Sequence, residues 1–352
     1  MQRAIWIVSA ILSAAAPAHA DPVADFYKDK QIKFIIRAGV GGGYDSYSRL
    51  LGRHIGKHIP GHPQILPVNM PGGGGIRAAN YVAKVAPQDG TILTIVSQGL
   101  AIDQALGLNA AFLADLRDFH WIGNLSSSNQ ITVTWHTSPT KSLADALTRE
   151  TVIGTTQAGS IAVQIPAVYN NILGTKFRIV FGYPDGRDVN LAMERGEVEG
   201  RATNPWASYQ ALEPHYIQQK LITPILQVGM KKEADLPDVP LLRELAKNPA
   251  EQGVLDFMSM GVAVGRPIAT TPGVPADRVA ALRAAFDATL KDPEFIAEAK
   301  LQRAEIEPMT GAELAQLVND IIGAPAELRE RVKIAIQPTN AKELPGAKPS
   351  GD

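Results

Sequence analysis

Two glycine-rich loops, each between an apolar strand and a helix, most strongly constrain what this chain can fold into. The first, 39–43, follows the apolar run 32–36 and precedes a helix predicted to open at Ser46. The second, 72–75, follows the run 65–69 and precedes a helix predicted from Ile76. Glycine permits close approach of the backbone to a ligand, and helix N-termini offer free N–H groups at a positive dipole end. The pair predicts half of a binding cleft for a small carboxylate.

The same alternation of strands and helices continues along the chain and predicts an α/β fold. Further strands are predicted at 91–96, 131–135, 152–155, 177–181, 199–202 and 222–228. Continuous apolar strands separated by helices favour mostly parallel sheets that are covered on both faces. Ligands of such sheets lie outside the carboxyl ends of the strands. Loop residues at those ends are therefore the binding candidates: Gly41, Gly42, Gly43, Tyr44, Asp45, Gly73, Gly74, Gly75, Ser97, Gln98, Gly159, Ser160 and Tyr183.

The C-terminal third is rich in helix signals. Apolar residues recur at helical spacing between 275 and 290, and Thr310 with Glu313 forms a capping-box pattern. From residue 338 onward the chain is rich in proline, glycine and lysine, which predicts a flexible tail.

Length and charge narrow the class of protein. The 352 residues suffice for two domains, and the net charge of −1 gives no reason to expect a nucleic-acid partner. The first residues read as a secretory signal peptide: Arg3, an apolar run over 4–16, and Ala18-His19-Ala20 as a cleavage site. We therefore expect cleavage after Ala20 and a periplasmic protein, which without cysteine relies on its core for stability.

Enzyme and metal signatures are weak. His54, His58 and His62 are spaced four apart, but the chain lacks the rest of a zinc ligand pattern there, so solvent-facing histidines are favoured. Neither a nucleophile elbow nor a cysteine nucleophile is present. We predict no catalytic residues, metal or cofactor. The interleaved charges of 194–201 predict surface ion pairs, and Arg37, Arg77, Arg187 and Arg201 are candidates for pairing with a ligand carboxylate.

Both glycine loops and four other segments, taken together, resemble one known family. They are 35–45, 69–75, the stretch Ala78-Ala79-Asn80-Tyr81 to 86–91, Gly182-Tyr183-Pro184, 236–240 and 271–275. The chain resembles the periplasmic solute-binding proteins of tripartite tricarboxylate transporters, the TctC or Bug family, over nearly all of the expected mature chain. It departs from the family pattern at Arg37-Ala38-Gly39-Val40, at Tyr44 and at Arg77.

The resemblance implies a two-domain Venus flytrap clamshell. Residues 21–125 and 229–337 would form domain I, residues 126–228 domain II and residues 338–352 a flexible tail, so that the chain crosses the hinge twice. The family would hold a carboxylate through backbone amides and ordered waters at both glycine loops, which carries over to Gly41, Gly42, Gly43, Asp45, Gly73, Gly74 and Ser97. Domain II would add Gly159, Ser160 and Tyr183.

We therefore expect a monomeric, non-enzymatic binding protein that captures a small organic acid and delivers it to membrane permease subunits. Two other functions remain open from the sequence. One is a ligand-sensing periplasmic module for a signalling partner, and the other is an exported hydrolase that uses Asp45 or Ser97.

Overall fold

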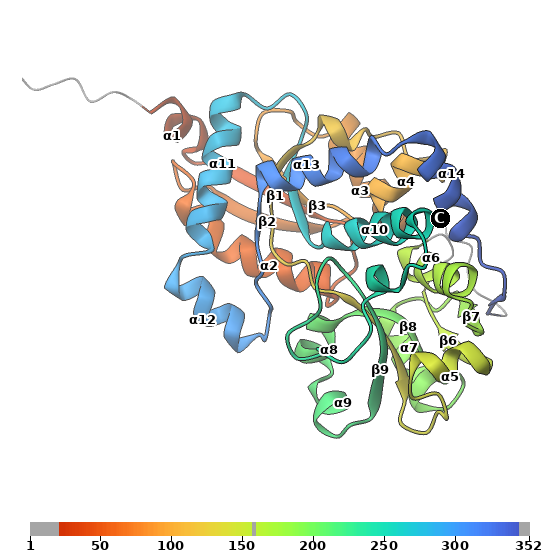
Figure 1. Cartoon of the computed structure of the whole chain (residues 1–352). Helices are drawn as coiled ribbons and strands as arrows, with labels where there is room; N and C mark the ends of the chain where they lie inside the picture. The colour runs from red at the N-terminus through yellow and green to blue at the C-terminus, as the bar shows by residue number, and fades with distance from the viewer. Residues whose placement is uncertain (1–20, 157–159, 345–352) are drawn as a thin grey trace, which may run out of the picture.

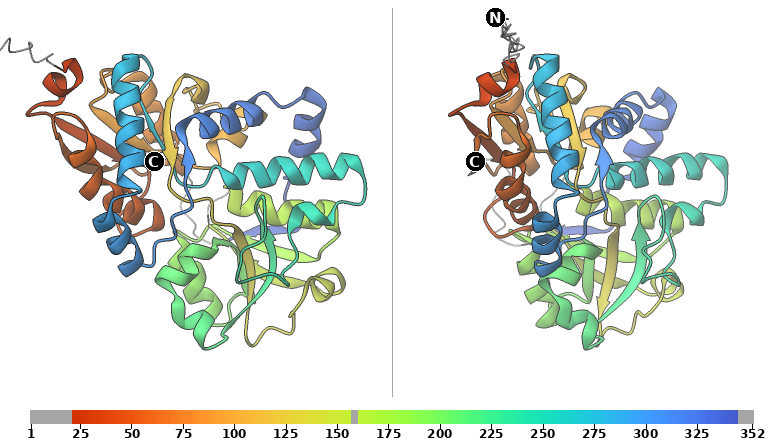
Figure 2. Two further views of the ribbon diagram at one scale, coloured as in Figure 1. Left: turned by 60° about the vertical axis from the view of Figure 1, so that its left-hand side comes forward. Right: turned by 90° about the vertical axis from the view of Figure 1, so that its left-hand side faces the viewer.

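The computed structural model describes residues 21–156 and 160–344. The predicted signal peptide, Gly159 and the last eight residues lie outside this part of the chain. The described residues form two lobes, each built on one six-stranded sheet (Figure 1). Two further views show the same separation of the lobes (Figure 2).

The sheet of the first lobe has the strand order β11-β4-β10-β3-β1-β2. β1 runs parallel to both β2 and β3, as the sequence predicts. β10 enters antiparallel between β3 and β4. The strands are β1 (Gln31–Ile36), β2 (Gln64–Asn69), β3 (Ile92–Ile95), β4 (His120–Asn124), β10 (Pro267–Thr270) and β11 (Met309–Thr310).

Helices cover both faces of this sheet because successive residues of its strands point in opposite directions. Ile32, Phe34 and Ile36 of β1 pack into one apolar cluster, and Ile35 packs into the other. The first cluster is closed by α1 (Pro22–Tyr27), α2 (Gly43–Ile55), α11 (Ala276–Thr289) and α12 (Pro293–Leu301). The other is closed by α3 (Ile76–Lys84), α4 (Leu100–Leu106), α10 (Pro249–Ala263), α13 (Gly311–Ile322) and α14 (Ala326–Ala335).

The second lobe has the strand order β12-β7-β6-β8-β5-β9, in which β5 runs antiparallel to β8 and β9. Its strands are β5 (Gln130–Trp135), β6 (Thr151–Gly154), β7 (Phe177–Phe181), β8 (Gly200–Pro205), β9 (Ile222–Val228) and β12 (Ala341–Glu343). Its helices are α5 (Leu143–Thr148), α6 (Ile161–Val168), α7 (Gly186–Glu194), α8 (Trp206–Leu212) and α9 (Pro214–Gln218). The expected α/β clamshell is confirmed.

Short helical turns complete the described secondary structure. They are η1 (Gly56–His58), η2 (Gly73–Gly75), η3 (Leu116–Asp118), η4 (Tyr169–Leu173) and η5 (Leu242–Leu245). None of the helices in the described ranges has both the length and the hydropathy that crossing a membrane requires.

The chain passes between the two sheets three times, where the sequence analysis expected two crossings. The third follows α14, where Asn171 Nδ2 donates to the carbonyls of Ala335 and Gln337, both at 2.8 Å. β12 then pairs in parallel with β7. The prediction of a flexible tail is therefore wrong for residues 341–343, because this segment completes the ladder of the second sheet.

Two local predictions can be compared directly with the structure. The capping box of α13 is confirmed: the Thr310 hydroxyl accepts from the Glu313 backbone N–H, and the Glu313 carboxylate accepts from that of Thr310. The start of α2 is wrong by three residues, because the helix begins at Gly43 rather than Ser46. Gly42 is the extended N-cap, and its carbonyl accepts from Ser46 N–H at 3.0 Å, which closes the first turn.

We predict that Gly123→Ala destabilises the first lobe by about 1 to 3 kcal/mol because it overpacks the core. A Cβ at this β4 position would lie 2.3 Å from Phe286 Cε1 of α11. Thermal unfolding measures the effect, and Gly39→Ala is the control because a Cβ there meets nothing within 4 Å. A wild-type melting temperature for Gly123→Ala would contradict this packing.

Candidate functional site

A cavity of about 400 Å³ lies between the lobes and is lined by residues of both. Four of the strands that reach it, β1, β3, β6 and β8, present their carboxyl ends, as expected for such sheets. β10 and β5 run antiparallel to their neighbours, so they present their beginnings instead. The polar lining residues are Arg37, Tyr44, Ser97, Gln98, Asp103, Asn109, Gln130, Thr155, Thr156, Ser160, Arg201, Thr203 and Arg266.

Three arginines line this cavity without a carboxylate partner. No ion pair recorded among the described residues includes Arg37, Arg201 or Arg266. Removing a guanidinium from water without a counter-charge costs free energy, and an anion in the cavity would offset that cost. The cavity is therefore electrostatically prepared for an anion.

Arg37 is held by the second glycine loop and by the end of β3. Its Nη1 donates to Ser97 Oγ at 2.7 Å and to the Gly74 carbonyl at 3.2 Å. Its Cζ lies 4.3 Å from the centre of the Tyr44 ring, whose hydroxyl accepts from Gln98 N–H at 3.3 Å. Nε of Arg37 is buried without a partner. The structure thus brings these predicted residues together around a cation.

Arg266 lies immediately before β10 and is 6% exposed. Its backbone N–H donates to Asn124 Oδ1 at 2.8 Å, and its Cζ lies 4.2 Å from the Tyr47 ring centre. Nη2 donates to Ser208 Oγ of the second lobe at 3.4 Å, while Nε is buried without a partner. These contacts position the guanidinium without an ion pair, and the nearby Glu305 carboxylate compensates its charge only at longer range.

Arg201 extends from β8 in the second lobe. Its Nη1 donates to Asn190 Oδ1 at 2.8 Å and its Nε to the Thr203 carbonyl at 3.2 Å. Burial lowers the pKa of Arg201 below its usual value, although arginine remains protonated in proteins. A Cβ at Gly186 would lie 2.3 Å from Nη2, so glycine at the start of α7 leaves room for this side chain.

A second cavity of about 280 Å³ also has Arg201 in its lining, so the two cavities adjoin at this residue. The first glycine loop, including Gly41, Gly42 and Gly43, lines this second cavity and is absent from the lining of the first. Arg187 Nη2 of the second lobe donates to the Gly41 carbonyl at 3.1 Å. The two glycine loops therefore face different cavities.

The buried Asp45 lines neither cavity. Its carboxylate accepts from Gly41 N–H at 2.9 Å, from Arg49 Nε at 2.9 Å and from Asn69 Nδ2 at 2.8 Å. Burial opposes ionisation of Asp45, but these hydrogen bonds outweigh it and lower the carboxyl pKa. Through these hydrogen bonds Asp45 connects the first glycine loop to α2 and β2.

Other predicted residues fall outside the cavity linings. Gly75 lies beneath the site, where a Cβ would come within 3.1 Å of both Arg37 and Ser97. Tyr183 is 6% exposed and packs in the apolar cluster of the second lobe. Arg77 also lines neither cavity. Gly73 and Ser160 line the first cavity, and Gly159 lies outside the described residues.

Asp103 of α4 is a cavity residue that the sequence analysis missed. Burial raises its pKa to about 6, and a hydrogen bond from Gln164 partly opposes the rise. Arg266 and Gln130 were missed as well. The rule that ligands lie beyond carboxyl ends applies to parallel strands, whereas these two residues lie at the start of antiparallel strands.

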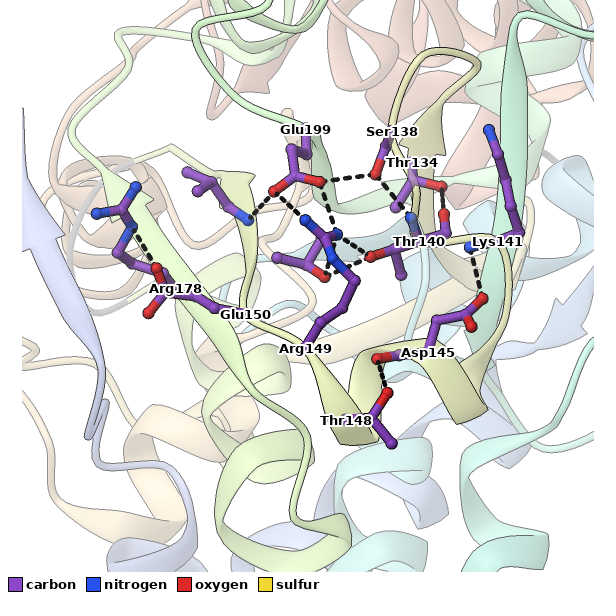
Figure 3. Close-up of polar contacts among 12 residues, drawn as sticks. Thr134, Ser138, Thr140, Lys141, Asp145, Thr148, Arg149, Glu150, Arg178 and Glu199 are labelled. Carbon is purple, nitrogen blue, oxygen red and sulfur yellow. Dashed lines mark hydrogen bonds and ion pairs between the residues drawn. The ribbon is translucent and has the colours of Figure 1, made fainter.

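Arg149, which lies outside the cavity linings, is an arginine whose charge is neutralised by a carboxylate of the protein. Figure 3 shows Arg149 directed at the Glu199 carboxylate, with Ser138 on the other side of that carboxylate. Arg149 Nη1 lies 2.8 Å from Glu199 Oε2 and also donates to Thr140. Within the acidic run the expected ion pairing occurs between Arg195 and Glu197 at 3.9 Å, whereas Glu199 pairs with Arg149 from outside the run.

Of the histidines predicted to face solvent, His62 is exposed, but the prediction is wrong for His54, which is 8% exposed because its ring packs edge-on against Phe295 of α12. His54 lies 2.6 Å from Glu298, and His58 lies 2.9 Å from Asp292. His54, Asp292 and Glu294 have the proximity to hold a metal. However, Lys57 Nζ lies 2.6 Å from Asp292 and 2.5 Å from Glu294, so an ammonium already neutralises these carboxylates.

Comparisons with known proteins identify the fold. No protein-family model matches the chain. A curated relative is 27% identical over 304 residues, 83% of this chain and 79% of its own length, and is described as a UPF0065 protein in the TAR-I ttuE-ttuC' intergenic region of Agrobacterium vitis.

Solved structures that resemble this chain include periplasmic solute-binding proteins. A TctC solute-binding protein from Polaromonas has a TM-score of 0.63, 18% identity and coverage of 87% and 99% of the two chains. MatC from Rhodopseudomonas palustris with bound malate has a TM-score of 0.63 and 19% identity, and the match covers 86% of this chain and 99% of MatC. An R. palustris protein with adipate has a TM-score of 0.65 and 17% identity, and the match covers 86% of this chain and 97% of that protein. This chain therefore has the fold of TctC-type solute-binding proteins.

We predict that Arg266→Met stabilises the ligand-free protein by about 1 kcal/mol, because it removes a buried guanidinium that makes no ion-pair contact, and the electrostatic attraction of Glu305 offsets only part of its desolvation cost. The matched control is Arg149→Met, which breaks the ion pair with Glu199 and should destabilise the protein by a similar amount. Denaturant unfolding of the two variants measures both effects. A loss of stability in Arg266→Met equal to that of the control would show that Arg266 is a structural residue.

Proposed function

We propose that this chain belongs to the TctC or Bug family and is an extracytoplasmic solute-binding protein, which captures a small organic carboxylate and delivers it to a tripartite tricarboxylate-type permease. The observation that carries the proposal is a set of three arginines around one cavity between two lobes, none of which forms an ion pair with a carboxylate of the described residues. The fold shared with solute-binding proteins, including those bound to malate and adipate, supports the same conclusion.

Guanidinium chemistry favours a carboxylate as the ligand. Arginine presents a planar set of donors that matches the two oxygens of a carboxylate, and such charge-assisted bonds are stronger than neutral ones. Arg37 and Arg266 each keep a buried Nε without a partner. Ligand oxygens would satisfy donors that the protein itself leaves unused.

The arrangement also links binding to closure of the lobes. Arg37 belongs to the first lobe, whereas Arg201 belongs to the second. A carboxylate ligand that contacts both would favour the closed arrangement, and exclusion of water would strengthen its hydrogen bonds. Arg187 adds a direct bond between the lobes at Gly41 and would hold them together beside the ligand.

The chemistry of the cavity argues against the exported hydrolase. Neither histidine nor cysteine is among the described residues that line it. Ser97 Oγ accepts a hydrogen bond from cationic Arg37, which cannot serve as a general base. Asp45 is buried in three hydrogen bonds and does not line the cavity. We therefore propose that the protein is not an enzyme.

Export and assembly complete the proposal. The signal-like start of the chain supports cleavage after Ala20 and delivery to the periplasm, where the mature monomer would meet its permease. Mass spectrometry of the exported protein tests the cleavage site.

Thermal unfolding of the chain from Asp21 onward, with a panel of mono-, di- and tricarboxylates and neutral nutrients, tests the binding function. A ligand at one hundred times its dissociation constant should stabilise the fold by about 2.7 kcal/mol. Arg37→Met should weaken binding at least about tenfold, since it removes a charge-assisted contact. The control Arg77→Met, outside both cavity linings, should bind as the wild type does.

Two results would overturn the proposal. One is the absence of a shift with any carboxylate, and the other is a shift produced by neutral sugars or amides instead. Equal binding by Arg37→Met and the wild type would remove Arg37 from the site.

A further inference from the structure

Asp103 is the one acidic residue among the described residues that line the first cavity. It lies in the first turn of α4, and its backbone N–H donates to the Gly99 carbonyl at 3.0 Å. No side-chain bond from Asp103 to the start of the helix is recorded in the described part of the chain, so helix capping does not explain the carboxylate. An anionic side chain in a cavity that otherwise attracts anions requires another explanation.

The carboxylate of Asp103 is poorly satisfied within the protein. Its recorded side-chain contact is a 3.4 Å bond from Gln164 Nε2, and no ion pair among the described residues includes it. A carboxylate has about four acceptor positions. Asp45, in contrast, accepts three bonds of 2.8 to 2.9 Å. Asp103 therefore retains acceptor capacity beside the cavity.

The three cavity arginines do not neutralise Asp103. Burial is the largest cause of its raised pKa, and no cation is among the groups that oppose the rise. The lining thus carries charges of both signs, guanidinium groups and a carboxylate, that do not pair with one another. Gln164 of α6 belongs to the second lobe, so the lobes also meet at the acidic part.

A ligand complementary to this lining carries charges of both signs. Its carboxylate would pair with a guanidinium, and a cationic group on the same molecule would pair with Asp103. A hydroxyl would donate a hydrogen bond to Asp103 but would leave its charge unneutralised in a partly buried site, which favours a cation. An ammonium is small, strongly charged and rich in donors.

We infer that the cavity takes an organic acid that also carries an ammonium group, and that Asp103 is the residue that selects for this group. This inference rests on the proposed carboxylate-binding function. It adds that acids without an amino group bind less well, because they leave Asp103 unpaired.

Calorimetry with matched ligand pairs tests the inference on the chain from Asp21 onward. The pairs are succinate and aspartate, glutarate and glutamate, and butyrate and 4-aminobutyrate, with malate added as a hydroxyl counterpart. We expect at least one amino-bearing acid to bind tenfold or more tightly than its partner without the amino group. Asp103→Asn should abolish this preference, so that the affinity ratio between each amino-bearing acid and its amino-free partner falls to about one.

Asp103→Asn keeps the size of the side chain and an oxygen that can accept from Gln164, and its melting temperature shows whether it is folded. Asp287→Asn, which alters an exposed acid of α11, is the matched control and should keep the wild-type preference. If Asp103→Asn is unfolded, Asp103→Glu provides the second test: its longer side chain displaces the carboxylate and should reduce the preference.

The outcomes separate this inference from the proposed function. If no acid binds, the proposed function itself fails. If succinate and aspartate bind equally, the other pairs behave alike and Asp103→Asn changes nothing, the carboxylate site stands but selection by Asp103 is wrong. Tighter binding of malate than of aspartate would overturn the inferred preference for an ammonium group and would show that Asp103 accepts from a neutral hydroxyl.

Discussion

The cleft of this protein depends on keeping cationic side chains in place without neutralising them. Arg266 illustrates how this is done, since its position is fixed by a backbone bond to Asn124 and by the face of the Tyr47 ring. Neutral acceptors and aromatic faces hold a guanidinium in position but leave its net charge available. The ion pair of Arg149 and Glu199 has the opposite property, because it neutralises both groups within the protein. An anion that enters the cleft can therefore pair with guanidinium groups that form no ion pair with the described residues.

The order of the strands decides which residues reach this cleft. β10 runs antiparallel to β3, and β5 runs antiparallel to β8. The beginnings of β10 and β5 therefore lie beside the carboxyl ends of β3 and β8. Arg266 and Gln130 reach the cavity in this way. The left-handed turn at Gly265 is part of this geometry, because a Cβ there would lie 2.0 Å from the Ser126 carbonyl. The last crossing of the chain, which ends in β12, attaches the C-terminal helices to the second lobe.

The two glycine loops are similar in sequence but differ in their surroundings. The second supports Arg37 through the Gly74 carbonyl, whereas the first is bracketed by Asp45 and contacts Arg187 of the other lobe. The first loop therefore lines the adjoining cavity rather than the one around Arg37. Together with Asp103, which pairs with none of the cavity arginines, this asymmetry favours a single orientation for a bound ligand.

The sequence by itself determined the elements whose signals are local. Apolar runs predicted β1, β2 and β7, and the Thr310–Glu313 pattern predicted the start of α13, because periodicity and capping involve residues a few positions apart. It also placed Tyr44, Gly74 and Ser97 at one sheet edge. Only the tertiary structure decided that Arg266 faces the cavity unpaired and that Asp45 does not face it. Whether a charge is neutralised depends on contacts between distant segments, such as Arg266 with Asn124, and local sequence patterns carry no record of those contacts.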